Sequence, residues 1–228
     1  MIDRTSNMIK CIGDYALTIY YDVLSYQNID GIFNNNAAEK GLIEDKVAAD
    51  CVTLVPNTAV LVIDMQGSFL KGMDEKLKKA LIDSQVEILR YCAEYDIPII
   101  IIEYADSVLP WSKNIEYNTI DDITEFVKSH KYDKVRKRSD SGFKKTVLEE
   151  VLRGLNARNV FLMGVNSSYC VLSTAIDAIN RGFSISTSQR VISDTTKYIY
   201  NDTKRWYKEH CVFFEDDFRG FFPRMSNE

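Results

Sequence analysis

Histidine is scarce in this chain, whose 228 residues include only His130 and His210. A zinc site built on three histidines is therefore excluded. Cysteine occurs five times, without any Cys-x-x-Cys pair. Widely spaced cysteines in an odd number are typical of free thiols in a reducing compartment, whereas a disulfide framework needs paired ones.

The chain also lacks the features of a secreted, membrane-bound or nucleic-acid-binding protein. Its longest apolar runs, such as Ile97–Ile102, are far shorter than the ~20 residues that cross a bilayer. No basic segment followed by an apolar run stands at the N-terminus, so we expect no secretory signal. A net charge of −5 argues against nucleic acid or anionic membrane as a partner. We therefore expect a cytoplasmic protein.

Several short apolar runs without polar alternation indicate strands of a parallel sheet that is buried on both faces. The clearest are Ala59–Ile63, Ile97–Ile102 and Asn159–Val165, and the weaker ones are Lys134–Lys137, Phe183–Ser188 and Cys211–Phe214. Apolar spacing predicts helices over Glu75–Tyr95, Lys144–Asn156, Tyr169–Asn180 and from Ser193 or Asp194 to about Lys208. This alternation predicts an α/β fold, a doubly wound, mostly parallel sheet of about six strands with helices on both faces.

Residues 1–56 do not share this pattern. They are rich in tyrosine and carry the run Asn34-Asn35-Asn36, which indicates a loop, while residues 37–50 suit a short helix. The stretch is too short and irregular for a separate domain. We therefore expect an N-terminal extension or arm over residues 1–56 and one folded domain over residues 57–228.

Three polar residues stand at or just beyond the ends of expected strands, where open α/β sheets bind ligands. They are Asp64, Lys137 and Cys170. Each also has a plain structural interpretation. Asp64 suits a helix cap or a loop, and Lys137 suits a solvated basic face. Cys170 suits a small buried side chain. Cys170 differs from the other cysteines because it opens an expected helix, whose N-terminus lowers the pKa of a thiol and favours the nucleophilic thiolate.

Three motifs, in this order and covering about residues 57–195, resemble those of the isochorismatase-like cysteine hydrolases. The first is Val62-Ile63-Asp64-Met65-Gln66 followed by Phe69. The second is similar to the family's Lys-x3-Ser-Ala-Phe-x2-Thr-x-Leu stretch and consists of Lys137, Ser141-Gly142-Phe143, Thr146 and Leu148. The third is similar to the family's nucleophile segment and consists of Gly164-Val165, Cys170-Val171, Thr174, Ala178 and Gly182.

The resemblance implies a catalytic triad of Asp64, Lys137 and Cys170. In such a triad the lysine stabilises the thiolate, and the aspartate transfers protons as base and then as acid. The cysteine attacks a carbonyl carbon and forms a thioester, so no histidine is needed. The resemblance also implies a cis peptide at Val165–Asn166 and an oxyanion hole made by the backbone N–H groups of Asn166 and Cys170.

Departures from the family pattern bear on the substrate. The family loop is commonly Gly-Val-(Ala/Thr)-Thr-x-x-Cys, whereas Asn166 and Tyr169 are bulkier and indicate a reshaped pocket. Nicotinamidases of the family carry an Asp/His metal-binding segment, but residues 103–111 contain no histidine, which disfavours metal-assisted nicotinamide hydrolysis. Isochorismatases cleave a vinyl ether without a catalytic cysteine, so Cys170 favours an amide or imide substrate.

Further candidates for substrate contact lie near the same strand ends. They are Gln66, Phe69, Tyr104, Trp111 and Tyr169. The aromatic members equally suit core packing. Arg190 has two open interpretations, an anchor for an anionic substrate group and an ordinary surface arginine.

The sequence thus predicts a metal-independent cysteine hydrolase of a small amide, imide or carbamoyl compound. The absence of Gly-x-Gly-x-x-Gly and Gly-x4-Gly-Lys motifs disfavours nucleotide binding, and we expect no cofactor. Two alternatives stay open, namely a vinyl-ether hydrolase of the isochorismatase type that uses Asp64 as acid, and a catalytically silent member that binds a ligand or partner. Family members commonly form homo-oligomers, and the Phe-rich stretch over residues 213–222 suits a subunit contact as well as core packing. We therefore expect a homo-oligomer.

Overall fold

Apolar side chains fill both faces of the central strands. The computed structural model describes residues 57–105, 118–128, 130, 132–195 and 199–215. Every residue of β1 (Thr58–Ile63), β2 (Ile99–Tyr104) and β4 (Asn159–Val165) is buried. Because successive side chains of a strand point to opposite faces, burial of all of them requires other layers on both sides of the sheet.

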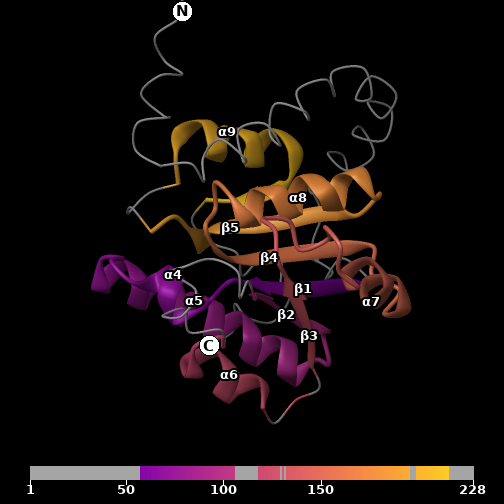
Figure 1. Cartoon of the computed structure of the whole chain (residues 1–228), viewed down its shortest axis with the longest axis horizontal. Coiled ribbons are helices and arrows are strands. Elements are labelled where there is room, and N and C mark those ends of the chain that lie inside the picture. The colour runs from indigo at the N-terminus through magenta and orange to yellow at the C-terminus, as the bar shows by residue number, and fades with distance from the viewer. Residues whose placement is uncertain (1–56, 106–117, 129, 131, 196–198, 216–228) are drawn as a thin grey trace, which may run out of the picture. The chain divides into compact units, whose positions relative to one another are not determined.

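These strands form the centre of a six-stranded parallel sheet, which Figure 1 shows. The outer strands are β3 (Tyr132–Lys137), β5 (Ser184–Ser193) and β6 (Val212–Phe214). The strand order is β3-β2-β1-β4-β5-β6, so the direction of winding reverses between β1 and β4. The predicted α/β class and parallel sheet are confirmed. In such sheets, ligands bind beyond the carboxyl ends of the strands at the point of reversal.

Helices connect the strands and cover the sheet. They are α4 (Gly67–Leu70), α5 (Glu75–Glu94), α6 (Asp121–Val127), α7 (Leu148–Gly154), α8 (Cys170–Asn180) and α9 (Asn201–His210). Helix α8 packs on β4 and β5, while α5 packs against α6 and β5 (Figure 1). Asp74 caps α5, because its carboxylate accepts the N–H groups of Lys76 and Leu77, each at 3.1 Å. Gly182, with φ 82°, follows the end of α8 as predicted.

The last helix differs most from the sequence-based expectation. It begins at Asn201, so the predicted start near Ser193 or Asp194 is wrong. Strand β5 continues to Ser193, and the Asp194 carboxylate accepts hydrogen bonds from the loop that precedes α8 instead of capping a helix. Helices α4 and α6 were not predicted because four and seven residues are too few to show a helical period.

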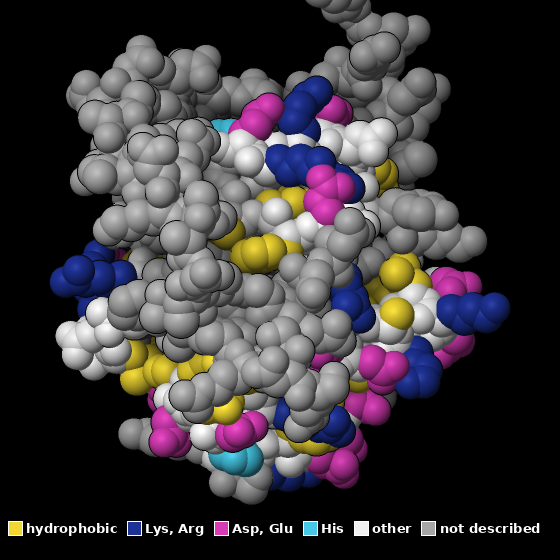
Figure 2. All heavy atoms as spheres, turned by 180° about the vertical axis from the view of Figure 1, so that it is seen from behind, with side chains coloured by type: hydrophobic (Ala, Val, Ile, Leu, Met, Phe, Trp, Pro, Cys, Tyr) yellow, Lys and Arg dark blue, Asp and Glu magenta, His cyan; other side chains and the backbone are white. Residues whose placement is uncertain are grey.

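The chain divides into two units, Met1–Cys51 and Val52–Glu228, and the described residues all belong to the second. The arm and the short helix expected before residue 57 therefore lie outside the described residues, and so do the aromatic residues beyond position 215. Within the described part, no helix is long and apolar enough to span a membrane. On the face shown in Figure 2, the described basic side chains alternate with acidic ones and do not gather into a basic patch.

Gly164 fixes how closely β4 can approach β1. Its φ is 138°, a region that residues with a side chain rarely adopt. A Cβ atom at this position would lie 2.1 Å from the backbone oxygen of Ile63, the last residue of β1. Since Asp64 follows Ile63, the absence of a side chain at Gly164 also allows the carboxyl ends of β1 and β4 to lie side by side.

We predict that Gly164→Ala lowers the free energy of unfolding by about 2–4 kcal/mol, because both the φ angle and the contact with the backbone are unfavourable for alanine. Gly154→Ala is the matched control, since a Cβ there meets no atom within 4 Å. Urea unfolding of the two variants provides the measurement. Equal midpoints for the two variants would contradict the close packing of β4 on β1.

Candidate active site

A buried ion pair joins the carboxyl ends of β1 and β3. Asp64 follows β1 with a φ of 52°, and Lys137 is the last residue of β3. Lys137 Nζ lies 2.7 Å from Asp64 Oδ2, and the two side chains are at most 1% exposed. Lys137 Nζ also donates to the backbone carbonyls of Ser139 at 3.1 Å and Asp140 at 2.8 Å. The ammonium is therefore held by three oxygen atoms away from water.

Cys170 joins this pair from the other side of β1. It is the first residue of α8, which follows β4, and it is 8% exposed. Asp64 and Lys137 both lie within hydrogen-bonding reach of its sulfur. The structure thus brings together the three residues that the sequence motifs single out, although 106 positions separate the first from the last.

Burial and charge shift the pKa values of the pair. Burial raises the pKa of the Asp64 carboxyl above its usual range, and the adjacent Lys137 ammonium offsets only part of this effect. Burial opposes the charge of Lys137, but the neighbouring Asp64, followed by Cys170, outweighs it and raises the pKa of Lys137. Lys137 therefore stays charged, while Asp64 is a stronger base than an ordinary carboxylate.

The pKa of Cys170 is shifted in the direction opposite to our prediction. Burial raises the pKa of this thiol well above its ordinary value. Lys137 lowers it in part, but the carboxylates of Asp64 and Asp140 raise it further. The lowering of this pKa that the helix N-terminus predicts is thus wrong for the substrate-free site, because burial, together with the neighbouring carboxylates, outweighs the charge of Lys137. Cys170 rests as a thiol beside a carboxylate that can take its proton.

The loop between β4 and α8 contains the predicted cis peptide at Val165–Asn166. Asp194 anchors this loop, since its carboxylate accepts from Ser167 Oγ at 2.5 Å and from Ser168 Oγ at 2.7 Å. The buried Tyr207 donates its hydroxyl to the Ser167 carbonyl at 2.8 Å. Asp194 and Tyr207 thus fix the backbone that leads into Cys170. No sequence motif predicted this role for either residue.

The other sequence-predicted site residues fall into different surroundings. Gln66 is fully buried, and its side-chain amide pairs with the backbone of Tyr104 at 3.1 and 2.8 Å. The Tyr104 ring centroid lies 5.4 Å from Lys137 Nζ and 6.1 Å from the Phe69 ring, so both aromatic residues stand beside the triad. Trp111 lies outside the described residues. The substrate-binding roles of this group stay predictions.

Two further residues complete the sequence-predicted set. Tyr169 directly precedes α8 and is half-buried. Burial, followed by the neighbouring Tyr200, Asp194 and Asp140, raises its pKa. Arg190 is exposed on β5 and lines a separate hollow with residues of α5 and α9. Of these two, Tyr169 is therefore the one that adjoins Cys170.

Comparisons with known proteins agree with this arrangement. A family model described as the isochorismatase domain matches residues 58–206, which is more than half of the chain. The chain belongs to the isochorismatase family. A curated relative, isochorismatase family protein 2A of Dictyostelium discoideum, is 26% identical over 68% of this chain and 76% of its own length.

Solved structures of the isochorismatase-like fold superpose on the described domain. An isochorismatase-like hydrolase from Alkaliphilus metalliredigens has a TM-score of 0.61 at 23% identity and covers 70% of this chain and 93% of its own. N-carbamoylsarcosine amidase from Thermoplasma acidophilum has a TM-score of 0.59 at 19% identity, with 70% and 95% coverage. Nicotinamidase from Bacillus subtilis has a TM-score of 0.57 at 20% identity, with 70% and 99% coverage. At these identities the likeness shows a shared fold, and the chain is a member of a family of hydrolases.

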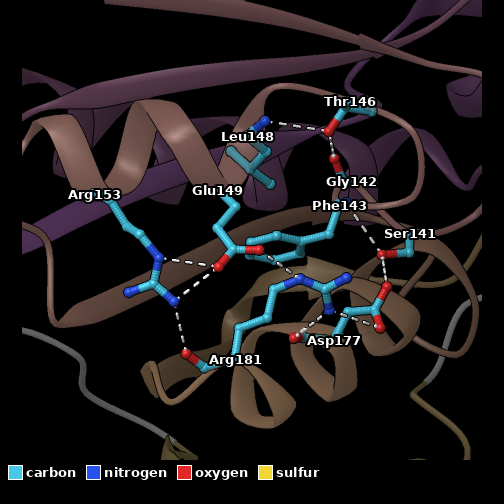
Figure 3. Close-up of polar contacts among 9 residues, drawn as sticks. All are labelled: Ser141, Gly142, Phe143, Thr146, Leu148, Glu149, Arg153, Asp177 and Arg181. Atoms are coloured by element: carbon cyan, nitrogen blue, oxygen red, sulfur yellow. Dashed lines mark hydrogen bonds and ion pairs between the residues drawn. The ribbon is translucent and has the colours of Figure 1, made fainter.

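The second isochorismatase-like motif forms the loop after β3 and the start of α7 (Figure 3). Ser141 hydrogen bonds to Asp177 of α8, which forms an ion pair with Arg181 at 3.0 Å. The Thr146 hydroxyl accepts from the backbone N–H of Leu148 at 3.2 Å and donates to the Gly142 carbonyl. This motif therefore holds the loop that follows Lys137 against α8.

No group of three or more His, Cys, Asp and Glu side chains suited to a metal ion occurs among the described residues. The three described cysteines, Cys92, Cys170 and Cys211, form no disulfide.

We predict that Lys137→Met lowers the free energy of unfolding by about 3–5 kcal/mol, because it leaves Asp64 buried without its cation. Adding Asp64→Asn to this variant should recover part of the loss, since the uncompensated charge is then gone. Lys79→Met is the control, because Lys79 pairs with Asp83 at the surface, where both side chains are at least 60% exposed. Chemical unfolding of the four proteins tests the pair, and a Lys137→Met variant as stable as Lys79→Met would contradict it.

Proposed function

We propose that the protein is a metal-independent cysteine hydrolase that acts on a small amide, imide or carbamoyl compound through a thioester on Cys170. The observation that carries the proposal is the buried Asp64–Lys137 ion pair in contact with the Cys170 sulfur. A nucleophile, a base and a fixed positive charge at one point are the parts that covalent acyl transfer requires.

In the first step, Asp64 takes the proton of the Cys170 thiol while the sulfur attacks the carbonyl carbon. The raised pKa of Asp64 suits this transfer, because a general base works best when its pKa lies near the working pH. Lys137 stabilises the negative charge on sulfur as the proton leaves. Its own raised pKa keeps it charged throughout.

The attack places a negative charge on the former carbonyl oxygen. We assign its stabilisation to the backbone N–H groups of Asn166 and Cys170. The first turn of α8 supports this assignment, because its N-cap residue Tyr169 makes no side-chain cap hydrogen bond within the described residues. Collapse of the intermediate expels the amine, which takes the proton from Asp64. A water molecule, activated by the same carboxylate, then hydrolyses the thioester and releases the acid.

Two features support an amide-type substrate without a metal. The chain has an intact cysteine nucleophile, which vinyl-ether cleavage does not need. Residues 103–111 supply no histidine, so they lack the metal-binding segment typical of the nicotinamidases. The solved amidases that share the fold, such as the N-carbamoylsarcosine amidase, are consistent with this chemistry.

We predict that Cys170→Ala lowers the hydrolysis of a panel of small amides, imides and carbamoyl compounds, followed as loss of the starting compound, by at least about 10³-fold, because the covalent route is lost. Asp64→Asn should cause a similar loss, since the thiol then has no proton acceptor. Cys211→Ala is the control, because this half-buried thiol lies at the end of α9, away from the triad. Unchanged turnover in Cys170→Ala would refute the thioester mechanism.

The same variants separate the proposal from isochorismatase-type chemistry, which the raised pKa of Asp64 also suits because a protonated carboxyl can act as acid. In that case Cys170→Ala keeps its activity on a vinyl ether, while Asp64→Asn abolishes it. A wild-type protein that turns over no compound of either class would be a catalytically silent member.

A further inference from the structure

Thr174 binds both the nucleophile residue and the loop that follows Lys137. It lies one turn after Cys170 in α8 and is fully buried. Its hydroxyl donates to the backbone carbonyl of Cys170 at 2.7 Å and accepts from the backbone N–H of Gly142 at 2.9 Å. The third family motif contains this threonine, but the steps proposed above give it no task.

The loop that Thr174 holds also binds the ammonium group of Lys137. Lys137 Nζ donates to the backbone carbonyls of Ser139 at 3.1 Å and Asp140 at 2.8 Å. These two residues stand directly before Ser141 and Gly142 in the chain. One hydroxyl group therefore connects the backbone that holds the lysine with the backbone that holds the nucleophile.

Close packing keeps this loop on the nucleophile helix. Gly142 is buried, and a Cβ atom on it would lie 2.9 Å from Ile102 Cδ1 and 3.4 Å from Thr174 Cγ2. Next to it, Ser141 hydrogen bonds to Asp177, about one turn further along α8, as Figure 3 shows. Loss of the Thr174 hydroxyl would leave the N–H of Gly142 buried without its acceptor, which is costly in so tight a contact.

We infer that Thr174 is a positioning residue for the proposed hydrolysis, which holds the Cys170 sulfur beside Lys137 and Asp64 through these two hydrogen bonds. The inference rests on the proposed function, because it concerns the same nucleophile. Proton transfer from the thiol requires contact with its acceptor, and the charge of Lys137 stabilises a thiolate most at short range. Thr174 acts on both through the backbone of Cys170.

Alkylation of Cys170 by iodoacetamide tests this role without a substrate, because the reaction needs the same thiolate. The rate is read by mass spectrometry on the tryptic peptide of residues 159–181, since Arg158 and Arg181 flank it and Cys170 is its only cysteine. Two variants separate the hydroxyl from the packing of the side chain. Thr174→Val removes the hydroxyl and keeps the branched shape, whereas Thr174→Ser keeps the hydroxyl and removes the methyl group.

We expect Thr174→Val to lower the alkylation rate at Cys170 by roughly tenfold, because a buried hydrogen-bonding pair is lost beside the nucleophile. Thr174→Ser should react nearly as fast as the wild type, since its hydroxyl can make both hydrogen bonds. Thr187→Val is the matched control and should leave the rate unchanged. Thr187 is equally buried and donates to the carbonyl of Leu162 at 2.8 Å, but both residues lie within strands, before the strand ends that form the site.

Three results would overturn the inference. The first is a Thr174→Val variant that is alkylated as fast as the wild type, or faster, because the contact would then at most restrict access to the sulfur. The second is an equal loss of rate in Thr174→Ser, which would assign the effect to the methyl group. The third is an equal loss in Thr187→Val. Should Thr174→Val not fold, Thr174→Ala set against Thr174→Ser gives the same comparison, because alanine and serine differ only in the hydroxyl.

This outcome is separate from that of the proposed function. Slower alkylation of Thr174→Val, in a protein whose wild type hydrolyses no amide, would refute the hydrolase proposal but support the positioning of Cys170 by Thr174. Hydrolysis that depends on Cys170, with unchanged alkylation of Thr174→Val, would support the hydrolase and refute the role of Thr174.

Discussion

The buried ion pair of Lys137 and Asp64 is the interaction on which the rest of the site depends. Two charges removed from water are tolerated only when each compensates the other and further hydrogen bonds satisfy their remaining donors and acceptors. Here Lys137 Nζ lies 2.7 Å from Asp64 Oδ2 and donates hydrogen bonds to two backbone carbonyls as well. Because β2 lies between β1 and β3 in the sheet, the pair spans the carboxyl ends of three strands.

The pair also determines the resting state of the nucleophile. A lysine beside Cys170 favours the thiolate, but burial of the thiol outweighs this effect, and the charge of Lys137 is matched by Asp64. In the proposed mechanism, the sulfur therefore keeps its proton until the substrate arrives. In that mechanism, this arrangement is the reason why an aspartate is needed as the base and why acyl transfer needs no histidine.

The sequence predicted the sheet, because runs that are apolar on both faces leave few alternatives to central parallel strands. The resemblance of three motifs to the isochorismatase-like family implied that Asp64, Lys137 and Cys170 meet, whereas their places at strand ends left each with a plain structural interpretation as well. The sequence did not predict the pKa of Cys170, which depends on burial and on distances between charges that no spacing reveals. The effect of Asp140 on this pKa was missed for a related reason, because an acidic residue after a basic run is usually a solvated loop residue.

Gln66 illustrates a different limit. Its place in the first motif predicts a role at the site, but its amide is bound to the backbone of Tyr104, which pairs in turn with Lys137 across β2 and β3. Such a residue positions the strand ends, and a sequence pattern cannot separate this task from substrate contact. Trp111 belongs to a segment outside the described residues, so its role stays a prediction.

The most direct test of the account is a search for the acyl group on Cys170 itself. The protein would be mixed with an amide that it turns over, quenched in acid within one turnover, and digested for mass spectrometry of the peptide over residues 159–181. The account predicts that this peptide gains the mass of the acyl group, and that the gain is lost when hydroxylamine cleaves the thioester. Turnover with an unmodified Cys170 peptide at every quench time, or with the acyl group on another residue, would contradict it.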